Sequence, residues 1–206
     1  MVSVIISIYI VDEEAEVLAK RTIADLKKCL SGNEFIVVDD GSPYPHKIPC
    51  ISKENGGNAS AWNFGIKLAK YDIILLSDSD IKPHNLRHMT KCLKEDVGVV
   101  FPVRHEGHND YRHPDGSFLM FRKSLWEKLE GFDESYGMYF EDTDFFKKVM
   151  AEGLKLVICE QSRITHFAKE TVNKVFTDKE QKDIFKKNKD KFEAKHGKEY
   201  PYIWES

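Results

Sequence analysis

Apolar runs and polar turns alternate along the first 80 residues. Nearly continuous apolar stretches at residues 2–10, 34–38 and 72–77 predict buried strands. Between them, apolar residues recur at helical spacing over residues 13–30, a helix ended by Gly32, and over residues 58–70, a helix capped by Asn58. A short strand is expected within residues 48–51. This alternation predicts a parallel α/β sheet that helices cover on both faces.

The second half of the chain is less regular. Its pattern predicts a helix at residues 85–94, a strand at 97–101, a polar loop at 102–116 and a strand at 117–122. A short helix at 123–130, a helix that opens near 139–144 and ends at Gly153, and a strand at 154–159 are expected to follow. After His166 the chain is rich in lysine and helical in pattern. We therefore expect one domain at 1–168, with halves 1–80 and 81–168, and a helical tail at 169–206.

Composition narrows the class of protein. A net charge of -3 gives no global sign of nucleic-acid or membrane binding. No apolar run approaches the ~20 residues that span a bilayer. The apolar start has no basic lead-in and runs straight into Asp12, so it is not a signal peptide, and a cytoplasmic location is expected. The four cysteines form no CxxC pair, which argues against a zinc site and a disulfide framework.

The most informative motif is Asp78-Ser79-Asp80, which follows a buried strand. Two carboxylates this close repel each other, and burial adds to the cost, unless a divalent cation lies between them and another anion. Mg²⁺ and Mn²⁺ prefer such oxygen ligands, usually together with substrate phosphates. The alternative is an ordinary turn and helix cap. Asp39-Asp40 ends another strand, so both acidic pairs should lie at the edge where parallel sheets bind ligands.

Two common phosphate-binding motifs are absent from the sequence. The first strand is followed by the acidic segment Val11–Glu14 instead of GxGxxG, and no GxxxxGK[ST] occurs. A metal ion held by Asp78 and Asp80 would then have to bind any phosphate.

These residues belong to a larger set of motifs. The chain resembles glycosyltransferase family 2, inverting nucleotide-sugar transferases of the GT-A fold, over about residues 2–167. The matching segments, in family order, are the strand 2–9, Ile36–Ser42, Asn55-Gly56-Gly57 with Asn63, Asp78-Ser79-Asp80, Gly131–Glu134, Phe140–Asp144 and His166. The resemblance implies a mostly parallel Rossmann-like central sheet flanked by helices. It also implies that residues 1–80 bind the nucleotide sugar and that residues 81–168 provide the acceptor and catalytic half.

The resemblance also implies roles for single residues. Asp142 is the expected catalytic base, with Glu141 as the second candidate, although acids at a helix start are also favoured by the helix dipole alone. Asp80, Asp78 and His166 are the expected ligands of Mn²⁺ or Mg²⁺. The expected donor-binding residues are Ser7, Tyr9, Asp39, Asp40, Asn55, Gly57, Asn63, Asp78 and Ser79.

A nucleotide-diphosphate sugar, with a UDP-sugar favoured, is the donor that the resemblance implies. A saccharide or glycoconjugate hydroxyl is the favoured acceptor. An anionic polymer or a modified nucleic-acid base is an alternative, because Arg104, Arg112 and the lysine-rich tail could meet it, although mixed charge is typical of a solvated helix face. A nucleotidyltransferase and a non-catalytic sugar or nucleotide binder are further alternatives. His105 and His108 are weighed as a second metal site.

Overall fold

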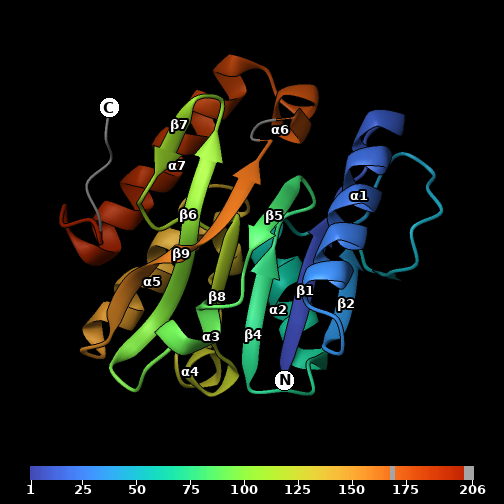
Figure 1. Ribbon diagram of the computed structural model, residues 1–206. Helices are drawn as coiled ribbons and strands as arrows, with labels where there is room; N and C mark the ends of the chain where they lie inside the picture. The colour runs from blue at the N-terminus through green and yellow to red at the C-terminus, as the bar shows by residue number, and fades with distance from the viewer. Residues whose placement is uncertain (168–169, 202–206) are drawn as a thin grey trace.

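A computed structural model describes residues 1–167 and 170–201 of the chain (Figure 1). The strands form one sheet in the order β3-β2-β1-β4-β8-β6-β9-β5, with β7 paired to β6. Its strands are β1 (Val2–Ile8), β2 (Glu34–Asp39), β3 (Ile51–Ser52), β4 (Ile73–Ser77), β5 (Ile81–Asn85), β6 (Val97–Glu106), β7 (Asn109–Tyr111), β8 (Phe118–Arg122) and β9 (Lys155–His166). Strands β1, β2, β3, β4, β6 and β9 point the same way, and β5, β7 and β8 run against them. The expected fold class, a mostly parallel sheet flanked by helices, is confirmed.

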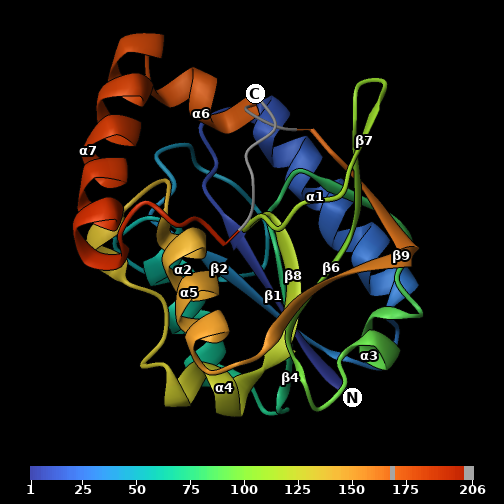
Figure 2. The ribbon, with the colours of Figure 1, turned by 90° about the vertical axis from the view of Figure 1, so that its left-hand side faces the viewer.

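Helices cover both faces of the sheet (Figures 1 and 2). The helical elements are α1 (Glu13–Cys29), α2 (Asn58–Leu68), α3 (Met89–Cys92), α4 (Lys123–Lys128), the 3₁₀ turn η1 (Glu134–Tyr136), α5 (Glu141–Ala151), α6 (Glu170–Val175) and α7 (Asp178–His196). α1 and α3 lie on one face, and α2, α4 and α5 on the other, with α7 outside α5. Alternate residues of β1 explain both layers, because Ile6 packs in the core on the α1 side and Ile5 in the core on the α2 side.

Two expectations for the second half are wrong. The helix at 85–94 is limited to α3, because residues 81–85 form β5 and pair with β9. The polar loop at 102–116 is a hairpin instead: β6 continues to Glu106, and β7 returns from Asn109. The reason in both cases is the unexpected length of β9, which runs on to His166 and supplies partners for both segments. A smaller correction concerns α2, whose N-cap is Gly57 and not Asn58.

The helical tail is present as α6 and α7. The expected boundary at residues 168 and 169 lies outside the described residues, as does the end of the tail at 202–206, so the division into domains stays a prediction. Within the part of the chain that the structure describes, no helix combines the length and apolar character needed to cross a membrane. The cytoplasmic location also stays a prediction.

Candidate active site

Asp78, Asp80 and His166 meet at one edge of the sheet. Asp78 and Asp80 follow the carboxyl end of β4, and His166 is the last residue of β9. The antiparallel register pairs Ile81 with His166, and the Phe167 amide donates to the Asp80 carbonyl at 3.0 Å. One ligand atom from each of the three side chains lies within 4.8 Å of the other two. The structure therefore brings together the three residues expected to hold a metal.

The electrostatics of this cluster favour an added cation. Burial and the neighbouring Asp80 carboxylate raise the pKa of Asp78 well above its ordinary value. Burial lowers the pKa of His166, but hydrogen bonds to Asp80 and Glu106 outweigh it and raise that pKa to about 10. Asp80 Oδ1 lies 3.2 Å from His166 Nε2. Two crowded carboxylates and an imidazole fit a divalent cation such as Mn²⁺.

Glu106, at the end of β6, orients the His166 ring. Its Oε1 lies 3.1 Å from His166 Nδ1 and 3.3 Å from Arg104 Nε. Arg104 Nη1 also contacts Asp115 Oδ2 at 3.0 Å. A carboxylate on one imidazole nitrogen fixes the tautomer and directs the other nitrogen toward a metal. The sequence reasoning missed this role, because Arg104-His105-Glu106 are three consecutive polar residues and show no alternation that would extend the strand.

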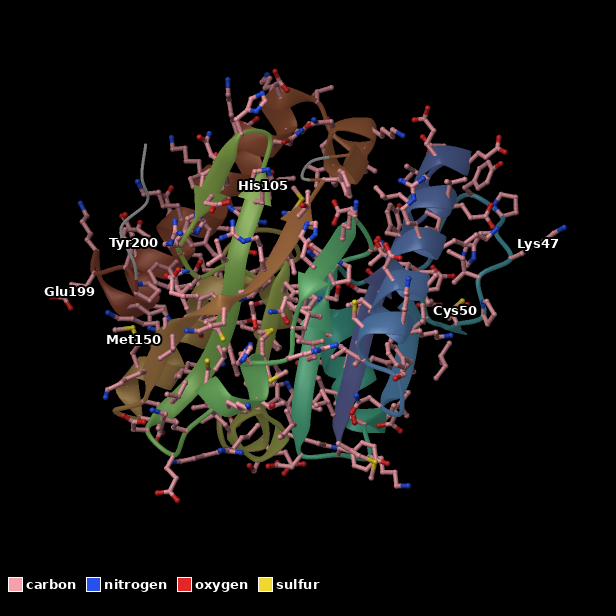
Figure 3. The ribbon with its side chains drawn as sticks, viewed as in Figure 1. Lys47, Cys50, His105, Met150, Glu199 and Tyr200 are labelled. Atoms are coloured by element: carbon pink, nitrogen blue, oxygen red, sulfur yellow. The ribbon has the colours of Figure 1, made fainter. Side chains whose placement is uncertain are left out.

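The second metal site weighed at His105 and His108 does not form. His105 Nδ1 pairs with Asp110 Oδ1 at 3.0 Å, on the hairpin at the end of β6 (Figure 3). Among residues 1–167 and 170–201, the groups with metal-ligand spacing are Asp78-Asp80-His166 and Asp39-His46-Cys50, and neither contains a hairpin histidine.

Asp142 lies at the start of α5, across from Gly116, which comes two residues before β8. Its Oδ1 accepts from the Thr143 amide at 2.6 Å and from Thr143 Oγ1 at 3.1 Å. A Cβ atom on Gly116 would lie 3.1 Å from Asp142 Cβ and 2.9 Å from Trp62 Cη2, so only glycine allows this close approach. Burial and the Asp115 charge raise the pKa of Asp142. A half-buried carboxylate with a raised pKa is well suited to accept a proton.

Glu141 lies beside Asp142 but is 5% exposed. Burial and the Asp142 charge raise the pKa of Glu141 to about 8. Its Oε2 is buried and has no hydrogen-bond partner among the described residues. The Asp142 charge contributes to the raised pKa of Asp78, and the Asp78 charge contributes to the raised pKa of Glu141. The start of α5 and the cluster of Asp78, Asp80 and His166 therefore form one acidic site.

Asp39, at the carboxyl end of β2, is held by three side chains. Ser42 Oγ donates to Asp39 Oδ1 at 2.6 Å, Ser52 Oγ donates to Oδ2 at 3.2 Å, and His46 Nε2 lies 3.4 Å from Oδ2. Burial raises the pKa of Asp39, but the hydrogen bonds from Ser42, His46 and Ser52 outweigh it and lower that pKa. The Ile48 amide donates to His46 Nδ1 at 3.2 Å, which leaves the ring proton on Nε2, facing Asp39. This tautomer suits a hydrogen bond and opposes a metal at Asp39, His46 and Cys50.

Asp40 organises the turn that contains Asn55 and Gly57. Its carboxylate accepts from the Gly56 and Gly57 amides, the latter at 2.8 Å, and from Lys53 Nζ at 2.6 Å. Asn55 Nδ2 donates to the Asp40 carbonyl at 3.0 Å. Asp40, Asn55 and Gly57 therefore lie together, and the Asp40 carboxylate is engaged in shaping the loop.

Asn63 is not directed at this edge. Its Oδ1 accepts from Trp126 Nε1 and the Phe132 amide, and its Nδ2 donates to the Phe132 carbonyl and to Glu134 Oε1. All its hydrogen-bonding groups thus join α2 to α4 and to the segment that follows α4. Ser7 pairs with Val38 near the carboxyl end of β1, and Tyr9 follows that strand and is half-buried. Roles for Ser7, Tyr9 and Ser79 in donor binding stay predictions.

Comparison with known protein families identifies the family of this chain. The model of the family described as glycosyl transferase family 2 matches residues 3–149, which is most of the chain. The chain belongs to glycosyltransferase family 2. The matched range includes Asp39, Asp78, Asp80 and Asp142, and ends before His166.

Two curated relatives of this family 2 chain are named for the same activity. The undecaprenyl-phosphate 4-deoxy-4-formamido-L-arabinose transferase of Pectobacterium atrosepticum is 30% identical over 50% of this chain and 36% of its own length. The protein of the same name from Photorhabdus laumondii is 30% identical over 48% of this chain and 35% of its own length. The matched part of the chain thus spans about a third of the length of these relatives.

A solved structure has the same fold as this family 2 chain. The mannosyltransferase PcManGT from Pyrobaculum calidifontis, in complex with GDP-Man and Mn²⁺, superimposes with a TM-score of 0.65 at 17% identity. The match covers 82% of this chain and 57% of that one. At this identity the likeness establishes the GT-A fold.

Proposed function

We propose that this family 2 chain is an inverting, metal-dependent glycosyltransferase that moves a sugar from a nucleotide-diphosphate donor to a hydroxyl acceptor. The observation that carries the proposal is the meeting of two groups at one sheet edge. Asp78, Asp80 and His166 have ligand atoms within 4.8 Å of one another, and the Asp142 charge helps to raise the pKa of the nearby Asp78. A metal-binding cluster beside a basic carboxylate is the machinery that inverting transfer requires.

Asp142 acts as the base in this proposal. It takes the proton from the acceptor hydroxyl as the oxygen attacks the anomeric carbon, while the bond from that carbon to the diphosphate oxygen breaks. Its raised pKa favours accepting the proton, and its half-buried carboxylate is open to an acceptor. Glu141 is the second candidate, but at 5% exposure it has less access to one.

Asp80, Asp78 and His166 are the proposed ligands of the cation. When bound there, Mn²⁺ or Mg²⁺ supplies charge stabilisation for the departing diphosphate. Mn²⁺ is favoured because an imidazole is among the ligands, and the fold neighbour was solved with that ion. Glu106 keeps the His166 ring oriented toward the site.

The proposed donor binds along the carboxyl ends of β1 and β2. In this proposal Asp39, which accepts from Ser42 and Ser52, also accepts a hydrogen bond from a pyrimidine N–H, and Tyr9 packs against the base. A UDP-sugar, the donor favoured from the sequence, is therefore the first class to test. The fold neighbour binds GDP-Man, so GDP-sugars are the second class to test.

The negative charge of the site affects which acceptors can bind there. Asp78, Asp80, Asp115, Glu141 and Asp142 gather here, and Arg104 is already paired with Asp115 and Glu106. A phosphate acceptor would meet repulsion that a neutral hydroxyl avoids. This favours a saccharide or glycoconjugate hydroxyl. The second candidate, a polyprenyl phosphate, is supported by the names of the curated relatives and needs no base, because a phosphate is already ionised.

The test is a donor and acceptor screen with purified protein and Mn²⁺. UDP-sugars and GDP-sugars are incubated with saccharide acceptors or with a short polyprenyl phosphate, and the anomer of each product is read by NMR. A product of inverted configuration with a saccharide supports the proposal. Product formed only with the lipid phosphate selects the second candidate. Nucleotide binding is measured separately, as an increase in the free energy of unfolding of the protein. A donor at 100 times its dissociation constant should add about 2.7 kcal/mol to that free energy. An increase with nucleoside triphosphates alone, together with pyrophosphate release, would instead identify a nucleotidyltransferase and refute sugar transfer.

A further inference from the structure

The loop that leads into Glu141 and Asp142 has an unusual backbone. Tyr139 and Phe140 have φ values of 66° and 74°, in the left-handed region that bulky side chains rarely adopt. Gly137, just before them, also has a positive φ of 72°. Such residues keep this conformation only where the surrounding structure enforces it. Something outside the loop must therefore hold it.

Asn188 of α7 supplies that restraint. Its Nδ2 donates to the carbonyl oxygens of Tyr136 at 2.8 Å, Met138 at 2.6 Å and Tyr139 at 3.3 Å. Asn188 is 3% exposed, although the neighbouring residues of this lysine-rich helix are mostly exposed. The two N–H groups of one side-chain amide thus contact three carbonyl oxygens in and just before the strained segment, with one N–H shared between two of them.

Aromatic side chains reinforce the contact. The Phe140 ring lies 5.1 Å from the Phe185 ring and 5.6 Å from the Phe192 ring, both on α7. Tyr200, which follows α7 and is labelled in Figure 3, stacks on Phe192 at 5.3 Å. Phe192 is fully buried. These contacts hold the Phe140 side chain in the direction that its left-handed backbone imposes.

The end of α7 is also anchored to α5 itself. Asp144 is fully buried, and its Oδ1 lies 2.6 Å from Lys195 Nζ and 2.7 Å from His196 Nε2. Asp144 comes two residues after Asp142 in the same helix. α7 therefore contacts the chain on both sides of the proposed base, at Tyr139 and at Asp144. In Figure 2 the lower end of α7 lies beside the upper end of α5.

We propose that α7 is a positioning element for the reaction and that Asn188 is its central positioning residue. By holding the left-handed loop, Asn188 fixes the place of Asp142 relative to the metal-binding cluster without touching substrate. The proposal rests on the proposed function for its kinetic consequence. A small misplacement of a reacting group can lower the rate by about 100-fold.

The test uses the full chain with Asn188→Ala. We expect kcat per folded molecule to fall about 100-fold, while the KM and dissociation constant for the donor stay unchanged. Hydrogen exchange of the amides at residues 139–143 should become faster. Asn188→Ser, which keeps one donor and brings no charge against the carbonyl oxygens, should change kcat in the same direction by a smaller factor and serves if the alanine variant folds poorly.

Two controls separate positioning from stability. Lys187→Ala, on the exposed side of α7, should behave as the wild type. Leu26→Ala, in the core on the other face of the sheet, should lower stability and leave kcat per folded molecule unchanged. A wild-type kcat in the Asn188 variants, or unchanged exchange at 139–143, overturns the proposal. If the wild type transfers no sugar, the proposed function fails, and the exchange measurement alone then decides whether Asn188 holds the loop.

Discussion

Glu106 Oε1 lies 3.1 Å from His166 Nδ1, so a β6 carboxylate holds the imidazole whose other nitrogen faces Asp80. We expect Glu106→Gln to weaken Mn²⁺ binding by about 10-fold to 100-fold, because the amide no longer fixes the ring as a charged acceptor does. Calorimetric titration with Mn²⁺ measures the change. Glu160→Gln, which alters an exposed carboxylate on β9, is the matched control. Equal Mn²⁺ affinity in the Glu106 variant and the control would show that Glu106 does not support the site.

Asp142→Asn should separate binding from turnover. The amide keeps the size of the side chain but accepts no proton, so kcat should fall by about 10²-fold to 10⁴-fold while donor affinity is retained. Initial rates and donor titration measure the two quantities. Glu141→Gln is the matched variant, and we expect a smaller loss because Glu141 is 5% exposed. A larger loss in Glu141→Gln than in Asp142→Asn would assign the base to Glu141.

We expect the protein to lose folding stability at acid pH as Asp133 becomes protonated. Burial by itself raises its pKa, but hydrogen bonds from Ser135 and Lys195 outweigh it and lower the pKa from 3.8 to about 2. Because the folded-state pKa is depressed, the stabilisation is present above pH 3.8 and is lost as the pH falls through about 2. The difference between the two values, at ~1.4 kcal/mol per pH unit, corresponds to about 2 kcal/mol.

Asp133→Asn tests this charge without removing the helix-capping oxygen. At pH 7 the free energy of unfolding of the variant should be about 2 kcal/mol lower than that of the wild type, and this difference should shrink as the pH falls toward 2. Urea unfolding at a series of pH values measures it. A difference that is the same at pH 7 and pH 2 would contradict the assigned pKa.

The local pattern was sufficient for the first half of the fold. β1, α1, β2, α2 and β4 lie close to their expected positions because each carries its own period and turn residues. The second half depends on pairing between distant segments. Leu86 and Met89 have helical spacing, yet the helix expected at 85–94 is limited to α3, and Asn85 is extended because it ends the strand that pairs with β9. Such long-range pairing leaves no local signal.

The site was predictable where the chemistry is local to a motif. Asp78-Ser79-Asp80 and His166 meet as expected, since strand ends of parallel strands share one edge. Glu106 was missed because 60 residues separate it from His166. Asn188 was missed because its neighbours are typical of a solvated helix face, and only the strained loop at Tyr139 explains its burial. Asn63, expected at the donor, is instead a buried link between helices.

The most direct test of the account is Mn²⁺ dependence at Asp80. Chelator-treated protein is titrated with Mn²⁺ in the presence of UDP or GDP, and transfer is measured before and after Mn²⁺ is restored. Asp96→Asn, at a surface carboxylate paired with Lys155, is the matched control. We expect the wild type and the control to bind Mn²⁺ and regain transfer, and we expect Asp80→Asn to do neither. Full transfer by the chelator-treated wild type, or Mn²⁺ binding by Asp80→Asn equal to that of the wild type, would contradict it.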